Sequence, residues 1–328
     1  MIRTKEQLNE MRINTPELYD SLKKRTAEAI TTAFKVGDMT VLNVDMDLLN
    51  IPDFQRDLNE HRALELAESY DSSCNHPISI AYVDEVFWVI DGYHGLVAAM
   101  LAYGCNPNVE NPITSVGCRL FVGKTFEECC LMFIGLNDKK SLSTYAKFNA
   151  YLLSGAITTK GGYAAKLVHD IVTVKYGVPI QHKTQKGRLS AVRTPFLLAQ
   201  RRPDADEVLD WIFKILVQSD FYQNERGMAV DIILALEDVY DTFKNYHLDV
   251  ATEVCLDIFE KNTYKTLLNE FIGFYKGIDK RTAIKHYLKT CVGKQLQESN
   301  LETPYSVRKV IKASKTVNMK KSKKSNKK

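Results

Sequence analysis

The chain has 328 residues, of which 45% are hydrophobic, so it is long enough for two domains that each have a core. No apolar run has membrane-spanning length and the first residues lack the pattern of a secretory signal, which excludes an integral membrane protein and predicts a cytoplasmic one. The seven cysteines include no Cys-x-x-Cys pair, so buried free thiols are expected rather than a zinc site or a disulfide framework.

The net charge of +4 is unevenly distributed along the chain. Residues 305–328 contain ten Lys or Arg and no acidic residue, and the remainder of the chain has a net charge of −6. A second stretch, 171–203, also lacks Asp and Glu but contains seven basic residues. Segregated positive charge is typical of nucleic-acid contact, although solubilising tails and solvated loops show it too. The candidate nucleic-acid-binding residues are Lys183, Lys186, Arg188, Arg193, Lys320, Lys321, Lys323 and Lys324.

The first 140 residues mix helices with strands. Thr15-Pro16-Glu17 combines an N-cap residue, a first-position proline and an acid, which predicts a helix that extends to residue 34 and stops before Gly37. Thr125 and Glu128 form a capping-box pattern at the start of another helix. Periodicity and turn residues predict strands at 40–44, 78–83, 86–90 and 116–122, and further helices at 59–70, 94–103 and 125–136.

From residue 143 onward only helices are predicted. Apolar residues recur at helical spacing in 145–152, 164–176, 208–217, 232–243, 264–275 and 283–292. The expected fold class is therefore α+β, with a small mixed domain followed by an all-helical domain and a disordered basic tail. We expect an N-terminal helix in 1–37, the mixed domain in 38–140, the helical domain in 141–300 and the Lys-rich tail in 301–328.

One short turn has the composition of a phosphate site. In WVIDGYHGLVAAMLAYG, residues 88–104, a strand stops at Asp91-Gly92 and a helix follows. A helix start has unpaired N–H groups, and Gly92 would let a ligand approach the backbone closely. His94 could add a donor, and Asp91 could cap the helix or bind a sugar hydroxyl. The alternative is an ordinary capped turn with no ligand.

The order of short motifs around this turn resembles the ParB N-terminal and sulfiredoxin-like domain family. Ile51-Pro-Asp-Phe-Gln-Arg56 precedes a helix, Pro77-Ile78 begins a strand, and Asp91-Gly92-x-His94 follows. The pattern is most similar to phage- and plasmid-associated members with an Asp-Gly-Gln-His-Arg turn, over roughly residues 38–150. The resemblance implies DNA association and a nucleotide triphosphate, with magnesium, as the ligand. It implies as nucleotide- or phosphate-binding residues Arg56, Asp91, Gly92, Tyr93, His94 and Asn137.

The turn departs from the family at two positions. Tyr93 stands where sulfiredoxin has its nucleophilic cysteine, so that redox chemistry has no thiolate here. Gly95 stands where the family has an arginine, the side chain best suited to bidentate phosphate contact. The turn therefore has the shape expected of a phosphate site but lacks one expected ligand.

Three functions follow as hypotheses. The first is a ParB-like DNA-associated binding protein of a mobile genetic element, and the second is a ParB-like nuclease or nucleotide hydrolase. The third is a protein–protein adaptor with a vestigial pocket. Metal-dependent cleavage needs convergent carboxylates, and only Asp91, with Asp84 and Glu85 at the far end of the hairpin, stands near the turn. We therefore name no catalytic and no metal-ligating residue. DNA is the expected partner, no membrane association is expected, and a homo-oligomer is left open.

Deleting residues 305–328 tests the charge argument. Each phosphate that the protein neutralises should contribute about −0.9 to the slope of log affinity against log salt. Because the tail holds ten positive charges and no acid, its removal should flatten that slope for duplex DNA. The melting temperature should barely change, because a disordered tail buries no core. A truncated chain that binds with the original slope would make the tail a solubilising segment only.

Overall fold

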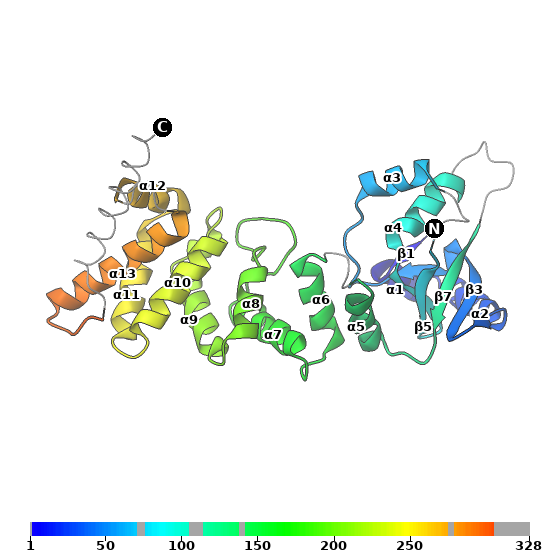
Figure 1. The fold of residues 1–328 in the computed structure, drawn as a ribbon, viewed down its shortest axis with the longest axis horizontal. Coiled ribbons are helices and arrows are strands. Elements are labelled where there is room, and N and C mark those ends of the chain that lie inside the picture. Colours follow the sequence, from blue (N-terminus) through cyan, green and yellow to red (C-terminus); the bar gives the residue numbers. More distant parts are fainter. Residues whose placement is uncertain (1, 71–75, 105–113, 138–141, 275–278, 305–328) are drawn as a thin grey trace, which may run out of the picture. The chain divides into compact units, whose positions relative to one another are not determined.

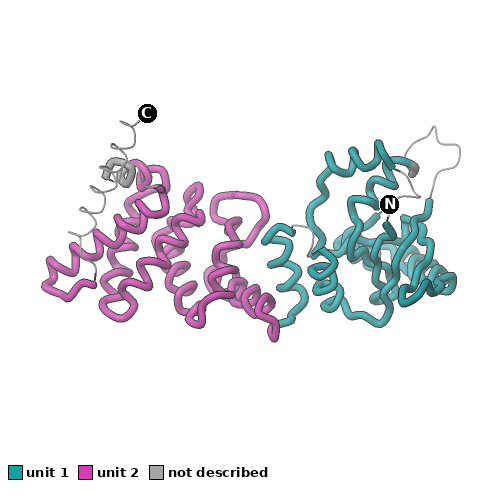
Figure 2. Tube along the Cα trace, viewed as in Figure 1, with its two compact units in different colours: residues 1–156 teal, residues 157–328 magenta. Residues whose placement is uncertain are grey.

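The computed structural model describes residues 2–70, 76–104, 114–137, 142–274 and 279–304. The fold is α+β, with a seven-stranded sheet near the N-terminus and helices after it (Figure 1). The chain divides into two compact units, residues 1–156 (unit 1) and 157–328 (unit 2) (Figure 2). The boundary lies after residue 156 rather than at 140/141, because helix α6 (Thr144–Ser154) packs against α5 (Phe126–Leu136). The predicted tail lies outside the described residues from 305 onward.

The sheet of unit 1 is built around a buried hairpin. Strands β5 (Ile78–Val83) and β6 (Val86–Asp91) match the predicted strands and are almost continuously buried. Asp84 and Glu85 join them with positive φ at both positions, as two-residue hairpin turns require. The strand order is β1-β4-β6-β5-β7-β3-β2. The other strands are β1 (Arg3–Thr4), β2 (Phe34–Val36), β3 (Met39–Asp45), β4 (Leu49–Ile51) and β7 (Ser115–Phe121).

The helices of unit 1 cover this sheet, and the segment expected to hold one N-terminal helix holds two. Thr15 ends α1 (Lys5–Asn14), which was not predicted, and precedes α2 (Pro16–Thr31). The predicted capping box of α5 is present, with the Thr125 side chain and the Glu128 side chain each bonded to the other's backbone N–H. The remaining helices are α3 (Glu60–Glu68), which lies beside α4 (Tyr93–Ala99), and a π-helical continuation of α4 at Met100–Gly104.

Among the described residues of unit 2 the regular secondary structure is helical, as predicted, apart from one isolated bridge between Ile180 and Leu189. Helix α10 packs against both α9 and α13 (Figure 1). Helices α8 and α11 were not predicted. The helices are α7 (Lys160–His169) with a π-helical extension at Asp170–Lys175, α8 (Arg193–Arg201), α9 (Ala205–Gln218), α10 (Val230–Phe243), α11 (Leu248–Lys261), α12 (Tyr264–Phe274) and α13 (Lys280–Glu298). Within the described ranges, no helix has both the length and the apolar character needed to cross a bilayer.

Four of the five cysteines that the structure describes are core residues, and the fifth, Cys291, is half-buried. Cys118, Cys129, Cys130 and Cys255 are buried and free, as the sequence predicts. Burial raises the pKa of Cys118 to about 12 and that of Cys129 to about 11, so neither thiol is ionised at neutral pH. Cys74 and Cys105 lie outside the described residues.

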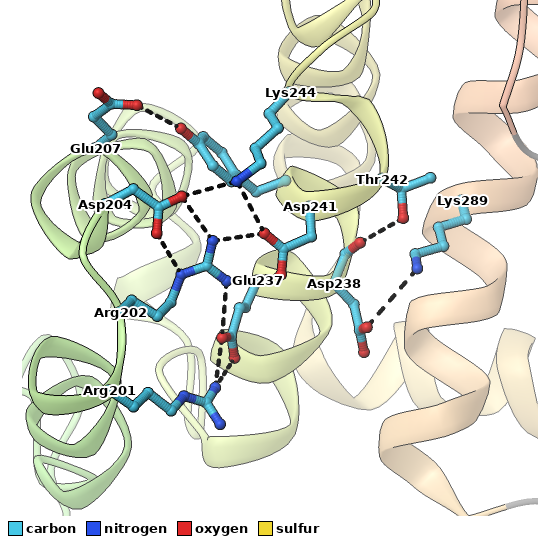
Figure 3. Close-up of polar contacts among 11 residues, drawn as sticks. Arg201, Arg202, Asp204, Glu207, Glu237, Asp238, Asp241, Thr242, Lys244 and Lys289 are labelled. Atoms are coloured by element: carbon cyan, nitrogen blue, oxygen red, sulfur yellow. Dashed lines mark hydrogen bonds and ion pairs between the residues drawn. The ribbon is translucent and has the colours of Figure 1, made fainter.

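A network of charges joins α8, α9 and α10 within unit 2 (Figure 3). Arg202 lies at its centre, with donor–acceptor distances of 2.9 Å to Asp204 and 2.6 Å to Asp241. Its third partner is Glu237, at 3.2 Å, which also accepts from Arg201. Basic residues from the acid-free segment 171–203 are thus neutralised by carboxylates that lie elsewhere in the sequence.

Replacing Arg202 should make the protein less stable and its stability less dependent on pH. Hydrogen bonds from Arg202 hold the pKa of Asp204 and of Asp241 below their ordinary values. A carboxyl group with a lowered folded-state pKa stabilises the fold above its unfolded pKa of about 3.9, and this contribution is lost as the pH falls further. Arg202→Met should lower the free energy of unfolding at pH 7 by about 2–3 kcal/mol and flatten its decline in acid.

Urea unfolding at a series of pH values checks this. Arg201→Met is the matched control, because the Arg201 side chain is 55% exposed whereas that of Arg202 is 13% exposed. The control should lose less stability. An Arg202→Met variant as stable as the wild type, with the same acid dependence, would show that the network adds nothing.

Candidate functional site

A cavity of about 560 Å³ lies in unit 1 where β6 ends and α4 begins. Its walls come from the segment after β4, from α3, from the start of β5, from the turn 91–95 and from β3 and β7. Cavities that hold small ligands generally have volumes of about 300–1,000 Å³. The predicted residues Arg56, Asp91, Gly92, Tyr93 and His94 all line it. The structure therefore brings together two motifs that are far apart in the sequence.

The turn requires glycine at position 92 for two reasons, its backbone conformation and its close approach to β5. The φ of Gly92 is +99°, in the left-handed region that L side chains rarely adopt. A Cβ atom would also lie 3.3 Å from Cγ1 and 3.4 Å from Cα of Ile78. The turn thus lies directly on the first residue of β5, which keeps the cavity open above it.

The neighbouring end of β6 contains an irregularity. Ser79 pairs with Asp91 and Ile80 pairs with Val89, so Ile90 is an extra residue in β6. Such bulges bend a strand, re-aim its side chains and are frequent beside functional sites. Here the bulge comes immediately before the turn, beside the backbone carbonyls of Val89 and Ile90.

Gln55 uses those carbonyls to fix the loop that contains Arg56. Its Nε2 donates to the carbonyl oxygens of Val89 and Ile90, at 2.9 Å each. The adjacent Phe54 is fully buried, with its ring centroid 5.5 Å from that of Phe133. The Gln-Arg pair of the sequence motif therefore has two roles, since Gln55 attaches the loop to β6 and Arg56 faces the cavity.

His94 is placed differently from the phosphate donor that was predicted. The residue is 8% exposed, and its Nε2 accepts a hydrogen bond of 3.1 Å from the backbone N–H of Asn59. An imidazole nitrogen that accepts is unprotonated, so the ring proton of neutral His94 lies on Nδ1. Asn59 is the N-cap of α3 and accepts from the N–H of Arg62. His94 thereby links the first turn of α4 to the start of α3.

The cavity has an excess of positive charge. Arg56 is half-buried and Arg62 is exposed, and within the described part of the chain neither guanidinium makes a hydrogen bond or an ion pair. Among the described residues that line the cavity, Asp91 is the one carboxylate. Burial raises the pKa of Tyr93, so its phenol stays neutral. Two guanidinium groups without protein partners suit an anionic ligand, above all a phosphate.

Arg62 and His76 line the cavity but were not predicted as site residues. Arg62, Leu66 and Tyr70 are spaced by four, and all three line the cavity. Arg62 and Leu66 lie on one face of α3, and Tyr70 follows the end of that helix. That spacing was readable in the predicted helix 59–70. His76 had no comparable signal, because it precedes a strand and follows residues outside the described ranges.

Asn137 does not belong to the cavity. It is fully buried at the C-cap of α5, and its Nδ2 donates to the carbonyl of Phe133 at 3.0 Å. The same carbonyl also accepts from the backbone N–H of Asn137 at 3.2 Å, so both the side chain and the backbone of Asn137 close the end of α5. The sequence order that suggested a ligand role for Asn137 reflects a helix end.

The predicted nucleic-acid-binding residues fall into two groups. Lys183, Lys186, Arg188 and Arg193 lie in unit 2, and among the described residues none of their side chains makes an ion pair. Lys320, Lys321, Lys323 and Lys324 lie outside the described residues.

Comparison of the chain with protein-family models, with curated proteins and with solved structures gives no match. The resemblance to the ParB N-terminal family therefore remains a prediction from the motifs. In the described ranges, no group of three or more His, Cys, Asp or Glu side chains is arranged to hold a metal ion.

The two glycines of the turn should respond oppositely to alanine. Gly92→Ala should lower the free energy of unfolding by about 1–2 kcal/mol, because an L residue is strained at positive φ and the new Cβ meets Ile78. Gly95→Ala should raise it by about 0.5–1 kcal/mol, because a Cβ there meets nothing within 4 Å and alanine favours the helix. Urea denaturation of both variants measures the difference, and the reverse ranking would contradict the geometry of the turn.

Proposed function

We propose that this chain is a ParB-like, DNA-associated binding protein of a mobile genetic element and that the cavity of unit 1 binds the phosphates of a nucleoside triphosphate. The observation that carries the proposal is the pair Arg56 and Arg62, which line one cavity with Gly92 and have no partner among the described residues. Guanidinium groups form charge-assisted hydrogen bonds to phosphate, often two at a time.

The fixed backbone around the two arginines supports the proposal. Gln55 attaches the loop of Arg56 to β6, and the Asn59–His94 bond joins the start of α3, where Arg62 lies, to the turn. Side chains on a fixed backbone lose less conformational freedom when a ligand binds. A volume of about 560 Å³ also suits a nucleotide rather than a bare phosphate.

The charges fit a nucleotide that arrives with magnesium. Magnesium in phosphate sites usually has one or two protein carboxylates, with phosphate and water oxygens as its other ligands. Asp91 is the one carboxylate that the described part of the chain contributes to the cavity wall, and it would face the ion. The two guanidinium groups would neutralise phosphate oxygens that the ion leaves exposed.

Calorimetric titration with CTP, ATP and GTP tests the site. We expect weak binding by the wild type and binding weakened by about ten- to a hundredfold in Arg56→Ala and in Arg62→Ala, since one charge-assisted hydrogen bond contributes about 1.5–3 kcal/mol. Gly95→Arg should tighten binding by a similar factor, because the space around Gly95 is open. Arg12→Ala on α1 is the control, since Arg12 is exposed and is not a lining residue.

The outcomes separate the three hypotheses. If the wild type and Gly95→Arg both fail to bind, and the arginine variants change nothing, the cavity is vestigial and the adaptor hypothesis replaces the proposal. Magnesium-dependent turnover of a nucleotide or of DNA that Arg56→Ala abolishes would replace it with the enzyme hypothesis. Melting curves of each variant show whether a loss of binding is a loss of fold.

A further inference from the structure

A second cavity, of about 180 Å³, lies in unit 2 between residues 184–191 and 222–230. We propose that it binds one backbone phosphate of a nucleic acid, held by Arg188 and Arg226. The inference rests on the proposed DNA association and adds a site to it. The sequence pattern singled out Arg188 but gave no signal for Arg226, which lies outside the acid-free segment.

The charge of this cavity is positive and uncompensated. Arg188 and Arg226 line it together with neutral polar residues such as Thr184, Ser190 and Asn224, and none of the described lining residues is acidic. In the described ranges neither arginine makes an ion pair. The guanidinium of Arg226 lies 5.0 Å from the ring centroid of Tyr264, a contact that leaves its N–H donors available at the edges.

Three other basic residues of the same segment are neutralised within the protein. Arg201 pairs with Glu237 and Arg202 has several carboxylate partners (Figure 3). Lys175 pairs with Asp210. The fold thus neutralises part of the acid-free segment and leaves Arg188 without a counter-charge. A partly buried guanidinium without a counter-charge is unfavourable in the free protein, and an anion would relieve that cost.

The two walls of the cavity are fixed to each other. The N–H of Gly187 donates to the carbonyl of Tyr222 at 3.2 Å, and Gly187 has a φ of +70°. A Cβ at Gly227 would lie 2.0 Å from the carbonyl oxygen of Phe221, so the second wall folds back closely on itself. Arg226, beside Gly227, has a φ of +65°. Both arginines therefore extend from a constrained backbone.

The size of the cavity indicates which group binds. A volume of 180 Å³ corresponds to the share of about six water molecules, which suits a single phosphate group and is too small for a whole nucleoside. Lys183, Lys186 and Arg193 stand in the same segment and are exposed. Several positive charges beside one phosphate site suit a polymer of phosphates better than a free ion.

The test uses the full chain and a labelled duplex DNA, with anisotropy measured over a series of NaCl concentrations. Arg188→Gln should weaken binding about tenfold at moderate salt, because the phosphate loses one of its two charge-assisted contacts. Arg188→Gln combined with Arg226→Gln should reduce the slope of log affinity against log salt by about 0.9, because the phosphate is then no longer neutralised. Arg188→Lys should keep the slope and bind more weakly than the wild type, because lysine retains the charge without the bidentate geometry.

The matched control is the variant Lys214→Gln/Lys294→Gln, which removes two exposed charges of unit 2 outside the cavity. It should leave the slope unchanged. Competition with inorganic phosphate distinguishes a site for nucleic acid from a site for free phosphate. If the site is for free phosphate, low millimolar phosphate should weaken DNA binding more than sodium chloride of equal ionic strength does. That result would overturn the assignment to nucleic acid.

The site is disproved if the wild type binds DNA and both arginine variants behave as the control does. That outcome contradicts this site but not the proposed function. If the wild type binds no DNA at any salt concentration, both the DNA association and this site are wrong. Nucleotide titration of Arg188→Gln should match that of the wild type, because the cavity of unit 1 does not include Arg188. Should Arg226→Gln fail to fold, Arg188→Gln alone decides.

Discussion

The close approach of Gly92 to Ile78 is the constraint on which the site of unit 1 depends. A strand that turns at once into a helix must change direction over its neighbouring strand, and here it does so with φ at +99° and with a tight contact to Ile78 for any added Cβ. The bulge at Ile90 lies two residues earlier, beside the carbonyls of Val89 and Ile90. Gln55 takes both of them, and the loop that contains Arg56 is fixed as a result.

Two kinds of polar residue meet in this cavity. Gln55, Asn59 and His94 form hydrogen bonds to other residues of the protein, and these bonds determine where the walls of the cavity lie. Arg56 and Arg62 have no such partner among the described residues, so their donors are available to a ligand. The position of a residue in the sequence motif does not show which of these two roles it has. His94, which stands in the motif, has a structural bond, and Arg62, which stands outside it, faces the cavity.

Much of the fold was predictable where local signals were strong. Strands β5 and β6 are continuous apolar runs joined by two turn residues, and α5 begins with a capping box, so their bounds were found almost to the residue. Strands β1, β2 and β4 have two or three residues each, which is too short for any alternation to show. Helix α1 is mostly polar and buries only Leu8, so periodicity could not reveal it.

The site was predictable in part for the same reason. The turn and the Gln-Arg pair are local patterns, whereas their meeting in one cavity depends on the pairing of β4 with β6, which lie far apart in the sequence. Asn137 was wrongly grouped with the turn because its order along the chain matched, although its side chain closes the end of α5. Sequence order can propose a set of residues but cannot tell which of them share a cavity.

A count of charges along the sequence is misleading for a related reason. The stretch 171–203 contains no acid, yet Asp210, Glu237 and Asp241 come from α9 and α10 to neutralise three of its basic side chains. Coulomb energy depends on distance in space, so a count along the chain overstates the free charge. Some basic residues remain without an ion pair among the described residues. Four of them, Arg56 and Arg62 in unit 1 and Arg188 and Arg226 in unit 2, line cavities whose walls include a glycine at positive φ or one too close to a neighbouring backbone for a side chain. Fixed backbone and uncompensated guanidinium groups therefore occur together, which is the arrangement that anion binding requires.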